Sequence, residues 1–338
     1  MPTETAAINL RKIAGQLCKR SVNDITHGGT GGNSRIFKIN CGDICFALKF
    51  YRTKNGQHRL NAESKALQFF ERHGINSTPR LIAFDKENNC SLLEWIEGEP
   101  LKRISSADID RTTSFLDRLH SLRKAPDAED LPIGTEACFS GNEILRQLRN
   151  RIVRLREVSE DYLPLKEFLE KDFAVAVEDM GLRGEAGFAA SGLDFSSMVN
   201  RDSLTLSPVD FGFHNTLRKK DGNIVFLDFE YFGWADPVNL ISDTLQHPKL
   251  NLEESLKGLF YRNMLKIYGS NSNFVNRLKI LFPLYGLRWC AIILNQFLPD
   301  YYSNLPKEKI NSQMQALKRA SNLLQEIYRV KKDFPYGD

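Results

Sequence analysis

The chain has 338 residues, of which 42% are hydrophobic and 26% are charged, so it can bury two hydrophobic cores and shows no bias toward disorder. Its 46 basic and 42 acidic side chains give a net charge of only +4, so we expect neither nucleic acid nor a membrane as a partner. The six cysteines show no CxxC spacing, which argues against a zinc site and for a reducing compartment. The first residues lack the pattern of a signal peptide and the apolar stretches fall far short of a membrane span, so the expected location is cytoplasmic.

A glycine-rich segment follows an expected N-terminal helix that contains Ile13 and Leu17. Residues 28–34 read Gly-Gly-Thr-Gly-Gly-Asn-Ser and precede the alternating residues 35–39, which predicts the turn of a β-hairpin. A dinucleotide fingerprint would place a helix after the glycines, and a P-loop would need Gly-Lys-Ser/Thr, so both are disfavoured. Taken alone, the segment is a weak signal, and a plain flexible hairpin is the simpler interpretation. If its backbone amides approach a phosphate, the candidate contacts are Gly29, Gly31, Gly32, Asn33 and Ser34.

The next apolar run, residues 44–50, predicts a strand that carries Lys49 among buried neighbours. A helix with Leu60 and Phe70 on its apolar face should follow and end at Gly74. Glu63 lies on the inner face of that helix, where its carboxylate could hold Lys49 as a phosphate-binding lysine. An isolated Lys or Glu is usually a solvated surface charge, so the interpretation depends on the rest of the sequence.

Two further strands are expected at residues 80–84 and 91–96, followed by a hinge at residues 97–100. Backbone groups at the edge of such a linker remain unpaired and can recognise a base. We therefore expect the carbonyl of Glu94 and the amide of Ile96 to bind adenine, without any role for their side chains.

The most informative segment runs from Ser207 to Asp228. Asn215 follows Asp210 by five residues, and Asp228 follows Asn215 by thirteen, at the end of a strand-like run. This order and spacing match the catalytic Asp, metal-binding Asn and metal-binding Asp of kinase-type phosphotransferases. The chemistry requires these residue types, because a carboxylate can accept the proton of an attacking hydroxyl and hard oxygen ligands suit Mg²⁺. The alternative is that the three residues only form turns and caps.

From Gly28 to about Asp243 the chain resembles the aminoglycoside phosphotransferase and choline-kinase-like family, the small-molecule relatives of protein kinases. The stretch from Asp228 to Tyr231 and the later Trp-Ala-Asp-Pro at residues 234–237 are typical of that family. The resemblance implies an α+β, bilobal protein-kinase-like fold, with an antiparallel-sheet N-lobe at residues 1–96 and a mainly helical C-lobe at residues 97–338. It also implies ATP and Mg²⁺ as cofactors. The roles it implies are phosphate binding for Lys49, proton acceptance for Asp210, metal binding for Asn215 and Asp228, and support of the catalytic loop for Asp236.

The chain departs from the family pattern before the catalytic Asp, where Pro208 and Val209 replace the usual His and Gly. Support of the loop must then come from elsewhere, either from His214 or from another residue. A nucleotide-binding module with little or no transferase activity therefore stays open as an alternative. Asp236 could also simply cap a helix that begins at Pro237.

Only seven residues separate Asp228 from Asp236, which leaves no room for the segment on which a protein kinase lays its peptide. The acceptor should therefore be a small molecule with a hydroxyl group, such as an amino sugar, a sugar or an amino alcohol. Glu230 and Asp243 are candidate contacts for a cationic acceptor. The sequence does not predict an oligomeric state.

The remainder of the chain is predicted to be helical. One expected helix carries an apolar stripe flanked by five arginines between residues 146 and 156, which either form a solvated face or bind an anionic substrate group. Arg288 and Trp289 lie in an aromatic-rich run that we interpret as core rather than substrate cleft. The expected helices span residues 105–122, 145–155, 252–268, 274–298 and 310–324.

Overall fold

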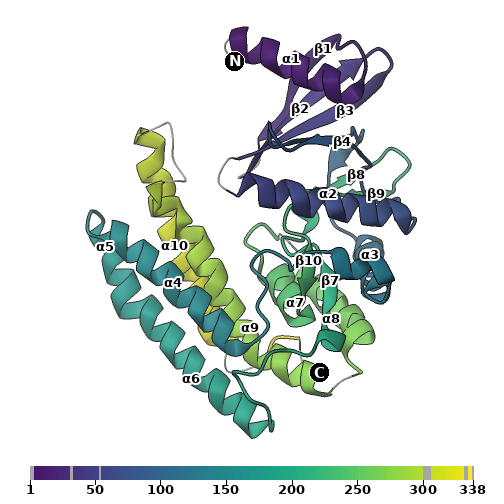
Figure 1. The fold of residues 1–338 in the computed structure, drawn as a ribbon. Helices are drawn as coiled ribbons and strands as arrows, with labels where there is room; N and C mark the ends of the chain where they lie inside the picture. Colours follow the sequence, from purple (N-terminus) through teal and green to yellow (C-terminus); the bar gives the residue numbers. More distant parts are fainter. Residues whose placement is uncertain are drawn as a thin grey trace. The chain divides into compact units, whose positions relative to one another are not determined.

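The structure is a computed structural model that describes residues 4–30, 33–52, 55–250, 252–270, 272–299, 306–330 and 334–336. The chain divides into two compact units (Figure 1). Unit 1 consists of Met1–Glu136 and Leu206–Trp234, and unit 2 consists of Ala137–Thr205 and Ala235–Asp338. The predicted α+β class, with an antiparallel sheet near the N-terminus and a helical remainder, is confirmed. The lobe boundary at residue 96 stays a prediction.

Unit 1 is built on a five-stranded antiparallel sheet with the strand order β1-β2-β3-β5-β4. The hairpin between β1 and β2 contains the glycine-rich segment, and a register shift between His27 and Gly29 bulges the first strand just before the turn. Helix α2 ends as expected, because Gly74 adopts a left-handed backbone with φ of 69° two residues beyond it. The elements are α1 (Glu4–Cys18), β1 (Asp24–Thr30), β2 (Ser34–Cys41), β3 (Ile44–Tyr51), α2 (Gly56–Arg72), β4 (Leu81–Asp85) and β5 (Cys90–Glu94).

Helices α1 and α2 cover opposite faces of this sheet, because successive side chains of a strand point to opposite sides. Leu48 of β3 packs into an apolar cluster with Ile39 of β2 and Ile13 of α1. The next residue, Lys49, instead reaches Glu63 of α2. Because side chains alternate along β3, Leu48 lies in the core and Lys49 lies in the candidate site.

The rest of unit 1 joins short strands to one long helix. Helix α3 begins with a capping box between Ser105 and Asp108, and Asp108 also accepts a hydrogen bond of 2.8 Å from Arg218 of β8. Strands β6, β8 and β9 form a three-stranded sheet, and β7 pairs with β10. The elements are β6 (Glu99–Pro100), α3 (Ser106–Leu122), the short helix η1 (Pro126–Asp130), β7 (Thr205–Ser207), the single turn η4 (Phe213–Asn215), β8 (Thr216–Arg218), β9 (Ile224–Phe226) and β10 (Gly233–Ala235).

A cluster of phenylalanines fixes the segment after β9 against the helices of unit 1. The ring centroids of Phe70 of α2 and Phe229 lie 4.9 Å apart, and those of Phe115 of α3 and Phe226 lie 4.5 Å apart. Aromatic pairs of this kind combine a large buried area with a preferred geometry. They place Asp228, which lies between Phe226 and Phe229, at a defined position.

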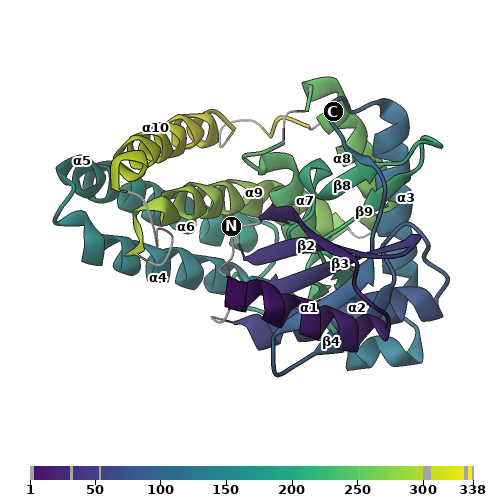
Figure 2. The same cartoon turned by 90° about the horizontal axis from the view of Figure 1, so that it is seen from above.

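Unit 2 is helical and is arranged around α9, which packs against α4, α6, α7 and α10. Figure 2 shows α4, α6, α9 and α10 running side by side. The segment from residue 163 to residue 190 forms helices that the sequence pattern did not single out. The elements are α4 (Gly141–Ser159), α5 (Leu163–Glu167), the wide helical turn η2 (Phe168–Phe173), α6 (Ala174–Ala190), η3 (Arg201–Ser203), α7 (Pro237–Gln246), α8 (Glu254–Tyr268), α9 (Ser272–Ile293), η5 (Leu294–Phe297) and α10 (Pro306–Val330).

One apolar segment is longer than the sequence analysis allowed. Residues Asn273–Phe297 are long and apolar enough to cross a membrane by length and composition alone. However, 72% of their most apolar stretch is buried inside the protein, because this segment is the central helix of unit 2. We therefore assign it to the core of unit 2.

Candidate active site

Lys49 is the centre of a buried cluster of charges in unit 1. Its Nζ lies 2.7 Å from Oε2 of Glu63, 2.6 Å from Oδ1 of Asp228 and 3.6 Å from Oε2 of Glu230. Burial lowers the pKa of Lys49, but the surrounding carboxylates outweigh burial and raise it well above the ordinary value. Lys49 is therefore a permanent cation, placed where Glu63 and Asp228 meet.

Glu63 is held in place by three donors. Lys49 binds one carboxylate oxygen, and the backbone amide of Phe229 donates to the other at 3.0 Å. The hydroxyl of Tyr51 also donates to Glu63 and lies 2.9 Å from the hydroxyl of Ser91. The contact between Lys49 and Glu63 that the sequence predicted is thus present. Tyr51 was missed, although it lies two residues after Lys49 on the same face of β3.

The loop that carries Asp210 is strained but well supported. Val209 adopts a left-handed backbone with φ of 65°, which is costly for a β-branched residue and is typical of functional sites. The amide of Val209 donates to Oγ of Ser207 at 3.1 Å, and Oδ1 of Asp210 lies 3.7 Å from Nε2 of His214. Ser207 and His214 therefore brace the loop in which Pro208 replaces the expected histidine.

Asn215 and Asp228 are brought together by the hairpin of β8 and β9. The amide of Leu227 donates to the carbonyl of Asn215 at 2.8 Å, which places Asn215 beside the residue that precedes Asp228. The side-chain amide of Asn215 also donates to the backbone carbonyl of Asp210 at 3.4 Å. Asp228 has a left-handed backbone with φ of 67°, and its side chain is 36% exposed. The three residues that the spacing singled out are thus neighbours in space.

Glu230 is almost fully buried, with 2% of its surface exposed, and it faces two cations. Besides Lys49, Nε of Arg59 lies 3.7 Å from its Oε1. Burial raises the pKa of Glu230 to about 7, against the pull of Lys49 and together with repulsion from Asp228 and Glu63. Sequence reasoning missed Arg59, although it lies one helical turn before Glu63 on α2.

The donor set fits a divalent cation. Asn215 and Asp228, the two residues expected to bind the metal, offer the hard oxygen ligands that Mg²⁺ prefers. The carboxylates of Glu63 and Asp228 balance the two cations Lys49 and Arg59, so ionisation of Glu230, whose pKa is raised to about 7, makes the cluster negative. Oε2 of Glu230 has no hydrogen-bond partner among the described residues. An added positive charge would therefore stabilise the cluster.

The glycine-rich segment is partly described. Gly31 and Gly32 lie outside the described residues, whereas Gly29 ends the bulge of β1 and Ser34 begins β2. The side-chain amide of Asn33 donates to the hydroxyl of Tyr231 at 2.7 Å. Tyr231 keeps its proton because burial raises its pKa to about 12. Asn33 therefore connects the glycine-rich segment to the chain just after Asp228.

The expected adenine contacts lie at the end of the sheet. Glu94 is the last residue of β5, and its side chain forms an ion pair of 3.3 Å with Arg80. Ile96 follows outside the strand and is partly exposed. This is the position of a linker edge, and the role of the two backbone groups stays a prediction.

Asp243 lies in α7 of unit 2 and is buried with 5% of its surface exposed. It forms an ion pair with Arg288, which is itself buried, so Arg288 belongs to the core as expected. Asp236 caps α7 through a hydrogen bond of 3.0 Å from the amide of Val238 and forms an ion pair with Arg277. Glu230 and Asp243, the two candidate contacts for a cationic acceptor, are thus both buried beside positive charges.

A family model and solved structures match the chain. A model of the phosphotransferase enzyme family matches residues 27–245. An ADP-bound aminoglycoside phosphotransferase, APH(2'')-Ib, aligns over 94% of this chain and 98% of its own, with 16% identity and a TM-score of 0.57. An ethanolamine kinase from Plasmodium vivax aligns over 96% and 91%, with 16% identity and a TM-score of 0.61. The choline kinase LicA from Streptococcus pneumoniae aligns over 93% and 99%, with 14% identity and a TM-score of 0.57. No match was found among curated proteins.

The antiparallel sheet with its buried Lys–Glu pair, together with the helical remainder, defines a protein-kinase-like fold. Because the family model covers more than half of its length, the chain belongs to the phosphotransferase enzyme family. It is therefore a phosphotransferase, as the sequence predicted.

Proposed function

We propose that the chain transfers the γ-phosphoryl group of ATP to a hydroxyl group of a small molecule. The observation that carries the proposal is the position of Lys49, whose Nζ lies 2.7 Å from Glu63 and 2.6 Å from Asp228. A lysine held between a helix carboxylate and a metal-binding Asp is the arrangement that aligns the phosphates of a nucleotide in kinases. The ADP- and ATP-bound relatives of the same fold support the choice of nucleotide.

The residues of unit 1 supply the remaining functions. Lys49 binds phosphate oxygens, and Asp210 accepts a hydrogen bond from the acceptor hydroxyl, orients it and takes its proton. Asn215 and Asp228 would hold Mg²⁺, which when bound neutralises charge on the phosphates. Asn33 and its neighbours in the glycine-rich segment would lie against the phosphates.

The size of the acceptor follows from the short path between the two aspartates. After Asp228 the chain reaches β10 at Gly233 and the cap of α7 at Asp236, so no long segment is available to bind a peptide. Aminoglycosides, choline and ethanolamine, which the similar proteins are named for, are all small hydroxyl compounds. We therefore propose a small hydroxyl compound as the acceptor here.

The alternative of an inactive nucleotide-binding module arose from Pro208. Ser207 and His214 contact the loop that lacks the expected histidine, and the side chain of Asn215 donates a hydrogen bond to the backbone of Asp210. These contacts favour an active enzyme.

The test is to incubate the full-length chain with ATP, Mg²⁺ and a panel of small hydroxyl compounds, and to detect phosphorylated product and ADP by mass spectrometry. Asp228→Asn is a suitable control, because Asn tolerates the left-handed backbone at this position but removes one carboxylate charge. We expect product from the parent, at least tenfold less from the variant and none in excess chelator. ATP binding without phosphorylation of any compound would instead support the inactive module.

A further inference from the structure

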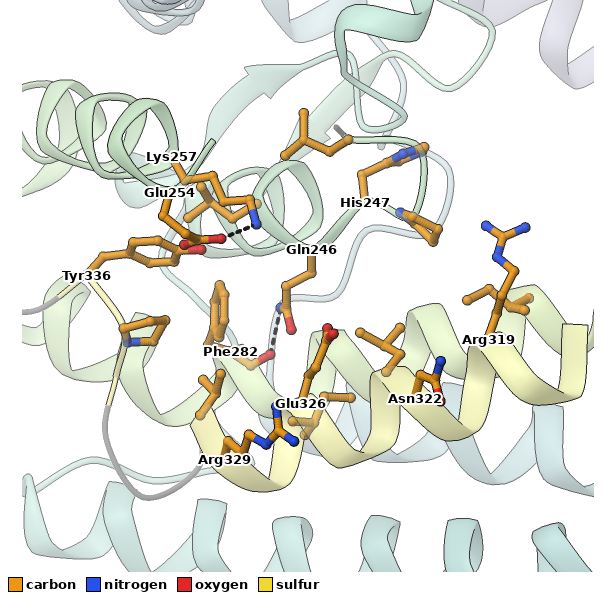
Figure 3. A pocket seen from close by; sticks show the side chains of 18 residues that line it. Gln246, His247, Glu254, Lys257, Phe282, Arg319, Asn322, Glu326, Arg329 and Tyr336 are labelled. Carbon is orange, nitrogen blue, oxygen red and sulfur yellow. Dashed lines mark hydrogen bonds and ion pairs between the residues drawn. The ribbon is translucent and has the colours of Figure 1, made fainter. Parts of the chain in front are cut away.

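Unit 2 contains a cavity of about 460 Å³ that is lined by none of the candidate active-site residues (Figure 3). It lies between the end of α7 with the turn that follows, the start of α8, helix α9 and the inner side of α10, and residues 335–336 close it at one end. Its volume falls within the range of small-molecule sites, which is about 300–1,000 Å³. It is therefore large enough for a monosaccharide or a compound of similar size.

The floor of the cavity is apolar, and its centre carries one oriented amide. Phe282 and Ile327 are buried in the floor, and the side-chain amide of Gln246 donates to the carbonyl of Phe282 at 2.9 Å. Figure 3 shows the Gln246 side chain in the middle of the cavity. Gly286 of α9 makes this packing possible, because a Cβ there would clash with Oε1 of Gln246 and lie 2.8 Å from Ile327. An apolar floor with one fixed amide suits a ring that carries hydroxyl groups.

The charges around the cavity favour an anion. Lys257, Arg319 and Arg329 line it together with Glu254 and Glu326. Lys257 is neutralised locally, since its Nζ lies 2.7 Å from Oε1 of Glu254. The two positive charges of Arg319 and Arg329 then exceed the single negative charge of Glu326. Arginine is the side chain best suited to a carboxylate or phosphate group, because its planar fork donates two parallel hydrogen bonds.

The two arginines are ten residues apart on α10, which corresponds to about 15 Å along a helix axis. Figure 3 shows Arg319 at the end near His247 and Arg329 toward the end at which Tyr336 lies. A ligand of monosaccharide size therefore meets one arginine with its anionic group and places its hydroxyl groups against Gln246 and Asn322. Glu326 can accept hydrogen bonds from the hydroxyl groups.

A cationic ligand finds less support. Phe282 and Tyr336, the aromatic residues of the cavity, pack edge to face against Phe334 rather than forming an open cage. Glu230 and Asp243 are the carboxylates that the sequence suggested for a cationic ligand. Glu230 is buried beside Arg59 in unit 1, and Asp243 is buried beside Arg288 in unit 2.

We propose that this cavity is a binding site for a hydroxyl-rich compound with an anionic group, of the sugar acid or sugar phosphate class. The binding site itself stands on the cavity, the arginines and the oriented amide of Gln246.

The test is calorimetric titration of the full-length chain with four compounds that share one ring: glucuronate, glucose 6-phosphate, glucose and glucosamine. We expect at least one of the two anionic compounds to bind at least tenfold more tightly than glucose, and glucosamine to bind most weakly. The two anionic compounds distinguish a carboxylate site from a phosphate site.

Arg319→Gln or Arg329→Gln should weaken binding of the anion by at least tenfold. Lys318→Gln, on the same helix but outside the lining of the cavity, should leave it unchanged.

Two kinds of result would overturn the inference. One is that glucosamine binds more tightly than both anions, or that none of the four compounds binds. The other is that both arginine variants bind the anion as the parent does. Failure of the proposed function gives a different result: the anion binds and depends on an arginine, but ATP and Mg²⁺ yield no phosphorylated product.

Discussion

At the scale of single residues, the position of Lys49 depends on Tyr51, an uncharged residue that holds Glu63 in place. Tyr51 follows Lys49 by two residues on β3 and donates a hydrogen bond to Glu63, and the Tyr51 hydroxyl is in turn fixed by Ser91. Burial raises the pKa of Tyr51 well above the ordinary value, so the hydroxyl keeps its proton and always donates. Glu63 therefore keeps one orientation toward Lys49.

We predict that Tyr51→Phe lowers the free energy of unfolding by about 1.5–3 kcal/mol, the usual contribution of a hydrogen bond to a charged group. The KM for ATP should rise several-fold, because Lys49 loses part of its support. Urea denaturation and steady-state kinetics measure both effects. Ser91→Ala, which removes only the outer partner, should have the smaller effect on KM. Equal effects of the two substitutions would contradict the role of Tyr51.

The sequence identified the residues of the site that carry the reaction better than those that support them. Lys49, Glu63, Asp210, Asn215 and Asp228 are brought together in unit 1, and their order and spacing in the sequence had identified them. Tyr51 and Arg59 were missed because a charged or aromatic residue on a strand or helix looks the same whether it faces water or a buried carboxylate. Their positions relative to Lys49 and Glu63, at i+2 and i−4, become informative only once those two residues are known to meet.

At the scale of elements, the loop of Asp210 is held against a glycine that is distant in sequence. A Cβ on Gly134 would lie 2.7 Å from Cγ2 of Val209, the strained residue just before Asp210. The amide of Gly134 also donates to the carbonyl of Trp234 at 2.9 Å, so its backbone cannot retreat freely. Any side chain at position 134 should therefore displace the loop that carries Asp210.

We predict that Gly134→Ala lowers turnover by about 10- to 100-fold, since a displacement of roughly 1 Å at a reacting group has that effect. ATP affinity should stay close to that of the parent, because Lys49 is not disturbed. Gly258→Ala is the matched control, since a Cβ there meets only the flexible end of Arg262 on α8. Equal turnover of the two variants would show that the loop adapts to the extra methyl group.

Helix α6 shows why part of the fold could not be predicted. Its sequence contains Gly181, Gly184 and Gly187, and each glycine costs up to about 1 kcal/mol of helix propensity. In the structure these glycines allow close packing, because a Cβ on Gly184 would lie 2.8 Å from the ring of Phe195 and one on Gly187 3.1 Å from Ile280. Tertiary packing thus outweighs local propensity. The longer helices with regular apolar stripes, such as α3 and α4, lie where the pattern placed them.

At the scale of the whole molecule, the two compact units are each assembled from separate stretches of chain. The chain leaves unit 1 after Glu136, returns at Leu206 and leaves again after Trp234. Composition and periodicity are local properties, so they did not predict these crossings. The antiparallel sheet and the helical class were predictable, because they depend on local alternation and helical spacing.

Global stability should depend on pH through His120 of α3. Burial and the nearby Arg123 and Lys124 lower the pKa of His120 from 6.5 to about 4, so the folded chain keeps it neutral where the unfolded chain is protonated. The contribution of neutral His120 to the free energy of unfolding is therefore complete above pH 6.5, and it is lost as the pH falls from 6.5 to 4. We predict that the free energy of unfolding declines more steeply between pH 6.5 and 4 in the parent than in His120→Gln. Parallel declines in urea denaturation would contradict this assignment.

The measurement that tests the central claim most directly is the turnover of Asp210→Asn with a validated acceptor. This substitution keeps the volume of the side chain but removes the proton acceptor next to Asn215. We predict that turnover falls by roughly two to four orders of magnitude, the usual contribution of a general base, while the Kd for ATP measured by calorimetry changes less than threefold. Turnover at the parental rate would contradict the account, because the group that takes the proton would then lie elsewhere.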